Sequence, residues 1–511
     1  MDSNRRIAVN SLYLSIRMVI VLCISLYTTR LTLRILGVED YGVYNVVCGL
    51  VTMFAFLNTS MNNGIQRFYN YELGKNGIMG ANAVYNASLI IQLLLTLILI
   101  ALAESFGLWY LHHRIVIPED RLFAAEWIFQ LSIISSLFLI MEAPYAAAVM
   151  AHEKMDFFSI VSVLDVVLKL IAVCILPLLQ SDLLILYGAM LTGISIFDFV
   201  LYFLFCKKHF KEIKLRKRRE KSDKRLLLDM LGFSGWNVFG SFSNTMRDQG
   251  LNLIINLFYG PVVNAARGVA MQVNTGITGL VSSILTPVRP QVIQSYAKGD
   301  LSRSMRLTHS ISKFSLCFLY LLALPVCVES SYILKLWLGD SVPAHTQSFV
   351  ILILLTSAIL IPMGALATLV HASGKMRKYQ VIGSIVKILS IPAAFFLLKK
   401  GLKPEWALIM VLLFDAIGLI VGMFIIRTLM SFSIMDYFRS VFFPIIPMIL
   451  ISFAAVWCLH LVIQNDLLRF FSVLIVGSAA IAGLSYLTAL SPEEKQLITA
   501  LVKSRIQKDK R

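Results

Sequence analysis

Charge is scarce in this chain. Asp, Glu, Lys and Arg make up 15% of its 511 residues, whereas hydrophobic residues make up 58%. A soluble domain has about 25% charged residues, because its surface must be compatible with water. The composition therefore excludes soluble, disordered and fibrous proteins. Ten-residue segments of alternating polarity, which membrane strands would require, are also absent. The remaining fold class is an all-α polytopic membrane protein.

Motifs for catalysis and metal binding are lacking too. No C-x-x-C pair occurs, and the seven cysteines lie in or beside apolar segments, which excludes a disulfide scaffold and a zinc site. No G-x-x-x-x-G-K-[ST] loop occurs, so we do not expect the chain to hydrolyse ATP. His112 and His113, with Glu119 and Asp120 nearby, are a weak metal candidate, and a solvated loop is the favoured interpretation. We predict neither an enzyme nor a cofactor.

Long apolar runs are abundant instead. A helix needs about 20 residues to cross about 30 Å of hydrocarbon. The first run carries Arg17 and no cleavage site follows it, so we interpret it as a retained span and not as a signal peptide. The sequence predicts about fourteen spans, at 10–33, 41–60, 83–107, 122–150, 158–180, 183–206, 229–259, 262–286, 307–328, 347–370, 380–398, 405–428, 440–463 and 468–489.

The net charge of +17 is distributed unevenly. With the N-terminus inside, the inside segments hold 31 of the 46 Lys and Arg residues, the outside segments 9 and the spans 6. Eleven of the bases lie between Lys207 and Arg225. The positive-inside rule then predicts that both termini and the 207–225 loop are cytoplasmic. An anionic membrane surface explains this basic run better than nucleic acid does, so no nucleic-acid partner is predicted.

Short segments also recur at a nearly constant distance of 221–225 residues. The pairs are Leu36-Gly37 with Tyr259-Gly260, 151–155 with 372–376, and 71–75 with 296–299. Six spans per half is an even number, so the halves would share one orientation and be related by an axis along the membrane normal. The predicted parts are an N-lobe at 1–206, a basic linker at 207–228, a C-lobe at 229–428, two extra spans at 429–489 and a basic tail at 490–511.

Charged residues inside the spans are the most informative candidates, because each costs at least about 2.5–3.5 kcal/mol at mid-helix and needs a partner or a wet cavity. Asp165 and Lys169 are four residues apart, and we expect them to pair. Lys313 and Arg267 lie near span ends and are candidates for extending to the membrane surface. The full set is Arg17, Lys169, Arg247, Arg267, Lys313, Lys387, Glu142, Asp165, Asp198, Asp248 and Asp415.

Polar residues form stripes on spans 1, 2, 7 and 8, which correspond between the two halves. We interpret these stripes as the walls of a hydrated cleft, with amides that only bridge helices as the alternative. Arg17 and Arg247 have no acid four residues away, and Asp248 is expected to point about 100° from Arg247, too far to neutralise it. The predicted substrate-binding residues are Arg17, Arg247, Arg267, Asn45, Asn237, Asn244 and Asp248.

Several motifs resemble those of polysaccharide flippases of the multidrug/oligosaccharidyl-lipid/polysaccharide (MOP) exporter superfamily. The segment 34–44, RILGVEDYGVY, is similar to the R-x-L-G-x-x-D-Y-G-x-Y turn of that family, with Arg34, Gly37, Asp40 and Gly42 at its motif positions. The segment 333–339, ILKLWLG, resembles the family's I-L-x-L-W-L-G element. The segments 260–267 and 374–379 look like elements of the Wzx-like branch. Together the resemblance covers about residues 5–490.

This resemblance implies a fold and a function. Members have two six-helix lobes in a V, often with two extra helices, and a cationic central cavity. They move undecaprenyl-diphosphate-linked oligosaccharides from the inner to the outer leaflet of the cytoplasmic membrane, for O-antigen, capsule or exopolysaccharide synthesis. The implied partners are that lipid-linked oligosaccharide, membrane lipids and a polysaccharide polymerase complex. The alternatives are a multidrug or organic-cation antiporter of the same superfamily, which needs membrane acids, and a non-transport assembly subunit, which needs no cleft.

Overall fold

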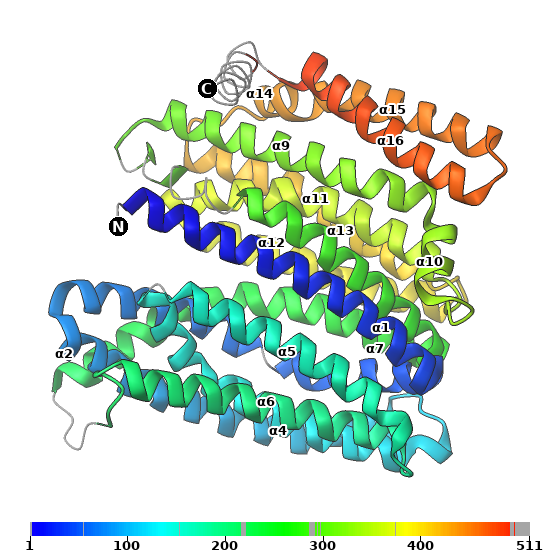
Figure 1. The fold of residues 1–511 in the computed structure, drawn as a ribbon. Helices are drawn as coiled ribbons and strands as arrows, with labels where there is room; N and C mark the ends of the chain where they lie inside the picture. The colour runs from blue at the N-terminus through cyan, green and yellow to red at the C-terminus, as the bar shows by residue number, and fades with distance from the viewer. Residues whose placement is uncertain are drawn as a thin grey trace, which may run out of the picture. The chain divides into compact units, whose positions relative to one another are not determined.

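A computed structural model describes residues 3–54, 56–152, 154–215, 221–285, 292–293, 295–296, 298–373, 375–490 and 495. Helices dominate this part of the chain, and no strand occurs in it (Figure 1). The helices are α1 (Ser3–Phe54), α2 (Phe56–Leu102), α3 (Leu108–His113), α4 (Leu122–Ala151), α5 (Met155–Ile175), α6 (Leu183–His209), α7 (Lys221–Leu285), α9 (Leu301–Val328), α10 (Ser330–Leu338), α11 (Thr346–Ser373), α12 (Met376–Lys399), α13 (Glu405–Leu429), α14 (Ile434–Tyr437), α15 (Phe443–Val462) and α16 (Asp466–Leu484). The chain is an all-α polytopic membrane protein, as the composition predicts.

The number of spans depends on how two long helices are divided. By length and composition, 12 helices of the described chain can cross a membrane, whereas the sequence predicts about fourteen spans. Two of the candidates, Arg17–Met53 and Gly240–Ser282, each contain two predicted spans. Both are interrupted by a glycine with non-helical torsion angles, Gly37 in α1 and Gly260 in α7. The two numbers differ because each of these interrupted helices counts once among the 12 and twice among the fourteen.

The two interrupting glycines adopt nearly the same backbone conformation. Gly37 has φ 85° and ψ 167°, and Gly260 has φ 74° and ψ −172°, values that a side chain would strain. The two residues are 223 positions apart. Helix starts recur at a similar distance: α5 begins at Met155 and α12 at Met376, 221 residues later, and α6 and α13 begin 222 residues apart. The spacing seen in the short sequence segments thus extends to the helix boundaries.

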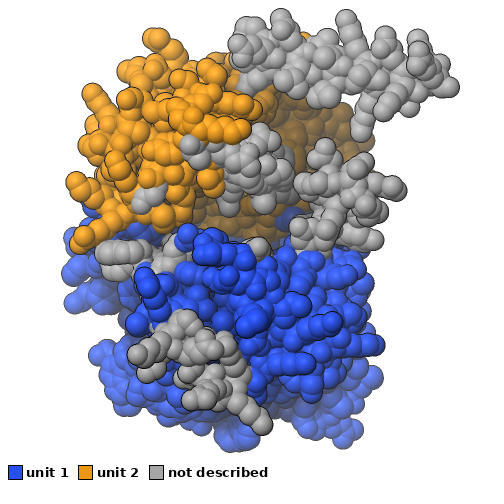
Figure 2. All heavy atoms as spheres, turned by 90° about the vertical axis from the view of Figure 1, so that its left-hand side faces the viewer, with its two compact units in different colours: residues 1–272, 337–349, 380–414 blue, residues 273–336, 350–379, 415–511 orange. Residues whose placement is uncertain are grey.

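The helices are grouped into two compact units, coloured in Figure 2. Unit 1 comprises residues 1–272, 337–349 and 380–414, and within it α4 packs on α2 and α6 while α1 packs on α5. Unit 2 comprises residues 273–336, 350–379 and 415–511, and within it α15, α16 and α9 pack together. The division runs through α7, α10, α11, α12 and α13, so it does not coincide with the predicted linker at 207–228.

The linker is only partly a loop. Its first bases, Lys207 and Lys208, belong to the last turn of α6, where cations complement the helix dipole. Glu212 is 2% exposed and binds Tyr69 and His152 through Oε1, at 3.0 and 2.5 Å. Residues 216–220 lie outside the described chain, and α7 begins at Lys221. The tail at 490–511 is described only at Leu490 and Lys495.

Candidate functional site

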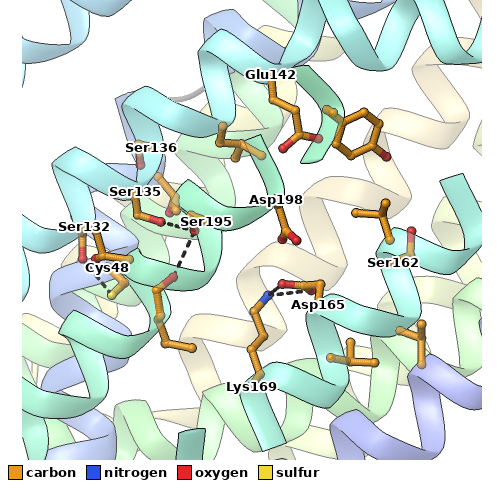
Figure 3. Close-up of a pocket in the computed structure, with 18 of the residues that line it drawn as sticks. Cys48, Ser132, Ser135, Ser136, Glu142, Ser162, Asp165, Lys169, Ser195 and Asp198 are labelled. Carbon is orange, nitrogen blue, oxygen red and sulfur yellow. Dashed lines mark hydrogen bonds and ion pairs between the residues drawn. The ribbon is translucent and has the colours of Figure 1, made fainter. Parts of the chain in front are cut away.

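A cavity of about 630 Å³ lies inside unit 1, between α1, α4, α5 and α6 (Figure 3). We call it the N-terminal cavity. Its lining follows one face of each helix, because the residues recur at steps of three and four. On α4 these are Ser132, Ser135, Ser136, Leu139 and Glu142; on α5, Phe158, Ser162, Asp165 and Lys169; on α6, Gly188, Thr192, Ser195, Asp198 and Tyr202.

Small residues bring α4 and α6 close enough to frame this cavity. A side chain at Gly188 would collide with Ile128 of α4. The Thr192 hydroxyl donates to the Leu131 carbonyl at 3.0 Å, and the Ser135 and Ser195 hydroxyls are 2.7 Å apart. Small residues and interhelical hydroxyl bonds are typical of helix packing in membranes, where the hydrophobic effect does not drive association. The same hydroxyls leave oxygen atoms along the cavity wall.

Some charged side chains of the cavity form an ion pair, and others form none within the described residues. Lys169 and Asp165 form the predicted ion pair, with Lys169 Nζ 2.8 Å from the carboxylate. Glu142 and Asp198 have no cation within 4.0 Å among the described residues. Figure 3 shows the carboxylates of Glu142, Asp198 and Asp165 directed into the same space, from three different helices. Carboxylates in a membrane span are costly, so three that face one space make this cavity a candidate functional site.

Arg17 is the other cation of this cavity, and its partners are neutral. Nη1 donates to the Ser162 hydroxyl at 3.2 Å, and the guanidinium carbon lies 4.8 Å from the centroid of the Phe158 ring. Its Nε is buried without a hydrogen-bond partner. Within the described chain Arg17 forms no ion pair. The guanidinium therefore keeps unused donors beside a polar cavity, a state suited to an anion.

The charges of this cavity were among the predicted candidates, but the cavity itself was not predicted. The predicted polar stripes lie on spans 1, 2, 7 and 8, whereas three of the four helices here are spans 4, 5 and 6. The signal was present, because Ser132, Ser135 and Glu142 fall on one helical face and Thr192, Ser195 and Asp198 on another. Aligning the acids of spans 4–6 by helical face would have located the site.

Arg247 and Asp248 correct one expectation. Arg247 Nε lies 3.0 Å from Asp248 Oδ1, so the adjacent acid does neutralise Arg247. The expectation was wrong because the 100° between neighbouring residues separates their Cβ directions, and a long arginine side chain can bend across that angle. Arg247 is 8% exposed. Its charge is therefore compensated on its own helix.

Arg267 and Lys313 do not extend to the membrane surface, which was the expectation for both. Both are 7% exposed, so neither extends to the membrane surface. Arg267 donates through Nη2 to the Asp248 carbonyl oxygen at 2.8 Å, and Lys313 lies 5.5 Å from the Phe314 ring centroid. The distance from a span end was counted along the sequence, and it does not tell which helix face is covered by neighbouring helices.

The remaining predicted cleft residues lie where α7 meets its neighbours. Asn252 of α7 donates to the Asn45 carbonyl of α1 at 3.3 Å, and Asn45 itself donates to the Tyr41 carbonyl at 2.7 Å. Asn244 accepts from Lys387 of α12 at 2.8 Å. The Asn237 side chain lies outside the description. We call Asn45, Arg247, Asp248, Asn252 and Arg267 the α7 cluster. The Asn252 amide bridges α7 and α1, whereas the Asn45 amide bonds within α1.

The 34–44 motif has a structural basis in unit 1. Gly37 makes the turn, and Arg34 is exposed. Asp40 is 5% exposed and pairs with Arg121 Nε at 2.9 Å. At Gly42 a side chain would collide with the Pro261 carbonyl of α7. The motif therefore joins the turn of α1 to the matching turn of α7 and to the start of α4.

His112 and His113, the weak metal candidate, lie at the end of a helix, and His112 contacts Glu126. His112 and His113 end α3 and do not lie in the expected loop, and His112 Nε2 is 2.7 Å from Glu126 Oε1. No group of three His, Cys, Asp or Glu side chains able to hold a metal occurs in the described ranges.

Comparisons with known proteins identify the fold. No family model matches the chain. The uncharacterized membrane protein EpsK of Bacillus subtilis (strain 168) is 22% identical over 336 residues, and the match spans 62% of each chain, less than two thirds of EpsK. The lipid II flippase MurJ in its inward closed conformation has a TM-score of 0.71 at 14% identity, covering 93% of this chain and 98% of MurJ.

Transporters share this fold as well. An inward-facing multidrug resistance MATE family transporter of the MOP superfamily has a TM-score of 0.62 at 13% identity, covering 80% of this chain and 97% of the transporter. A MOP superfamily transporter from Pyrococcus furiosus has a TM-score of 0.59 at 12% identity, covering 82% and 95%. The chain thus has the MOP-superfamily fold, which confirms the resemblance seen in its motifs at the level of the fold.

Proposed function

Because the chain has the fold of MOP-superfamily transporters, we propose that it is a flippase. Its substrate would be an oligosaccharide linked through a diphosphate to a polyprenyl lipid, moved from the inner to the outer leaflet by alternating access. The fold shared with MurJ, which is a lipid II flippase by name, supports a lipid-linked substrate. The observation that carries the proposal is Arg17, a cation beside a polar cavity with neutral partners.

Arg17 is the proposed contact of the diphosphate. A guanidinium presents paired N–H donors that match two phosphate oxygens, and charge-assisted bonds of this kind are about twice as strong as neutral ones. The hydroxyls of Ser135, Ser162 and Ser195 line the same cavity and suit the hydroxyl-rich sugar. An inside-negative potential favours outward movement of the head group by about 2.3 kcal/mol per charge for each 100 mV.

The polar residues around α7 form the second part of the proposal. Arg247 and Arg267 are both bonded to Asp248, which would hold them in fixed orientations. We place Asn45, Asn237, Asn244 and these three residues along the path of the substrate, with the N-lobe at 1–206 and the C-lobe at 229–428 as the moving parts. A polysaccharide polymerase complex would receive the product.

The orientation in the membrane is part of the same proposal. Both termini and the 207–225 loop would be cytoplasmic in a cytoplasmic, or inner, membrane, because most Lys and Arg residues fall in the predicted inside segments. A periplasm-active reporter fused after Lys224 should give no signal, and a cytoplasm-active reporter should be active. The opposite result at this position would reject the orientation.

An organic-cation antiporter is the second candidate, and one observation favours it. Glu142 and Asp198 direct carboxylates into the cavity without a cation within 4.0 Å in the described residues, and carboxylates are what a cationic drug would need. The two candidates differ in which charge is indispensable. Arg17→Ala should abolish flippase activity, whereas Glu142→Gln with Asp198→Asn should abolish cation transport.

The deciding experiment uses the purified protein in liposomes. Polyprenyl-diphosphate-linked oligosaccharide is placed in both leaflets, and its accessibility to an added glycosidase is followed over time. The unchanged protein should expose all of the lipid, and Arg17→Ala should leave the inner-leaflet half protected. Arg427→Ala, at an exposed arginine in the last turn of α13, is the matched control and should behave as the unchanged protein. Protection of half the lipid by the unchanged protein would reject a flippase.

A further inference from the structure

A second, smaller groove meets the N-terminal cavity at Arg17. It has a volume of about 360 Å³ and is lined by α1 and α5, which pack side by side in unit 1 (Figure 1). Its walls are apolar over most of their length. Asp156 lies at one end, and Arg17 lies one to two turns further along α5, where it contacts Phe158 and Ser162. The residues that matter below are Arg17, Ile20, Ser159, Ile160, Val163 and Val167.

The outer side of this groove carries residues exposed in the way that lipid-facing residues are. Ile160 is 66% exposed and Ile20 is 38% exposed, although both lie on apolar spans. From Asp156 to Val167 the groove follows roughly 16 Å of helix, at about 1.5 Å per residue. That length is about half of the hydrocarbon thickness of a bilayer. An apolar chain lying there would remain in contact with the lipid interior.

Two polar atoms beside the groove lack hydrogen-bond partners. Arg17 Nε and Ser159 Oγ are both buried and form no hydrogen bond within the described chain. Ser159 is 6% exposed and lies on the groove wall. Buried polar groups normally have hydrogen-bond partners, so two without partners, Arg17 at the junction with the N-terminal cavity and Ser159 on the groove wall, indicate a site for a polar ligand. A ligand with a phosphate and an apolar chain would bond to these two polar atoms through its phosphate and pack its chain against the apolar walls.

We propose that the groove between α1 and α5 holds the polyprenyl tail of the transported lipid while its diphosphate binds at Arg17 and Ser159. This rests on the proposed function and assigns the tail a place in the N-terminal half of the chain. Arg17 would then mark the boundary between the head group, in the N-terminal cavity, and the tail, in the groove. The carboxylate of Asp156 repels a phosphate, so the head group lies toward the N-terminal cavity, which Arg17 lines and Asp156 does not.

Photo-crosslinking tests the position of the tail. A benzophenone amino acid replaces Ile160, and in the control it replaces Ile171, which is on the same helix, 46% exposed and not on the groove. In nanodiscs containing radiolabelled polyprenyl-diphosphate oligosaccharide, crosslinking at position 160 should exceed that at 171 by at least about tenfold. Unlabelled polyprenyl diphosphate should compete, and phosphatidylglycerol should not. Equal labelling at both positions, or equal competition by phosphatidylglycerol, would overturn the proposal.

A transport measurement separates the tail site from the function. Val163→Trp fills the groove, and Ile171→Trp is the control that places the same bulk outside it. Val163→Trp should slow movement of the long-chain lipid at least tenfold and leave binding of an analogue with the same head group and a short tail unchanged. Normal movement by Val163→Trp while Arg17→Ala is inactive rejects the tail site alone. If the unchanged protein moves no lipid-linked oligosaccharide, the flippase function itself fails.

Discussion

Arg17 and Arg247 are both arginines within apolar helices of unit 1, yet their surroundings differ. Arg17 faces a cavity of about 630 Å³ and, among the described residues, contacts the hydroxyl of Ser162 and the ring of Phe158. Arg247 is 8% exposed and is bonded to Asp248, whose carbonyl also accepts from Arg267. The first cation is available to a ligand, and the second has its charge compensated within the protein.

The comparison shows what a charge in a membrane span signifies. Each arginine costs several kcal/mol to insert and must recover that energy from a partner. For Arg247 the partner is a residue of the chain, so removing it should affect folding first. For Arg17 the strong partner is absent from the described chain, so removing it should affect ligand binding first. The following experiments separate these two outcomes.

Loss of Arg17 should have the largest effect. Arg17→Ala removes charge-assisted bonds worth about 1.5–3 kcal/mol, so glycan export per molecule should fall roughly 10- to 100-fold. Arg17→Lys should retain part of the activity, because an ammonium supplies the charge without the paired donors. Export is measured against the amount of protein in the membrane. Full export per molecule from Arg17→Ala would show that Arg17, like Arg247, is not needed to bind the substrate.

Crowding the contact between α1 and α7 should destabilise the protein without touching the cavity. At Gly42 a methyl group would collide with the Pro261 carbonyl, so Gly42→Ala should lower the unfolding free energy by about 1–3 kcal/mol or more. Gly193→Ala is the control, because no atom lies within 4 Å of its added carbon and alanine favours a helix by about 1 kcal/mol. Thermal unfolding in detergent compares the two. Equal melting temperatures would show that the contact is not tight.

Removal of Arg247 should lower stability more than activity. Arg247→Ala leaves the Asp248 carboxylate, whose side chain is 38% exposed, without its ion-pair partner, at a cost of about 1 kcal/mol. The amount of folded protein should therefore fall, while export per folded molecule should fall less than in Arg17→Ala. Pairing Arg247→Ala with Asp248→Asn should recover part of the folded amount. A complete loss of export at normal protein levels would instead make Arg247 a direct ligand of the substrate.

The Asp165–Lys169 pair should show the smallest effect. Its side chains are 23% and 40% exposed, and pairs four residues apart on a helix couple by about 0.3–0.5 kcal/mol. A double-mutant cycle with Asp165→Asn and Lys169→Gln should therefore give a coupling free energy below about 1 kcal/mol. A value of several kcal/mol would mean that the cavity is dry and that this pair resembles Arg247 with Asp248.

The spacing of residues along the chain was enough to predict the spans, the two glycine turns and one ion pair. Apolar runs of about 20 residues predict the spans, and the turns at Gly37 and Gly260 appear in the sequence as matching dipeptides. Asp165 and Lys169 were predicted to pair because one helix repeat places both on one face. Each of these features depends on neighbours within a few residues, where helix geometry is nearly constant.

Tertiary structure alone decided which polar groups are satisfied. The sequence on its own determined that the protein is a helical membrane protein with charges in its spans, because the bilayer permits few alternatives. It did not determine that Asp248 binds Arg247, that Lys313 and Arg267 are buried, or that spans 4, 5 and 6 enclose the cavity with Arg17. Those outcomes depend on side-chain reach and on residues more than 100 positions apart, such as Arg17 and Ser162, which only packing brings together.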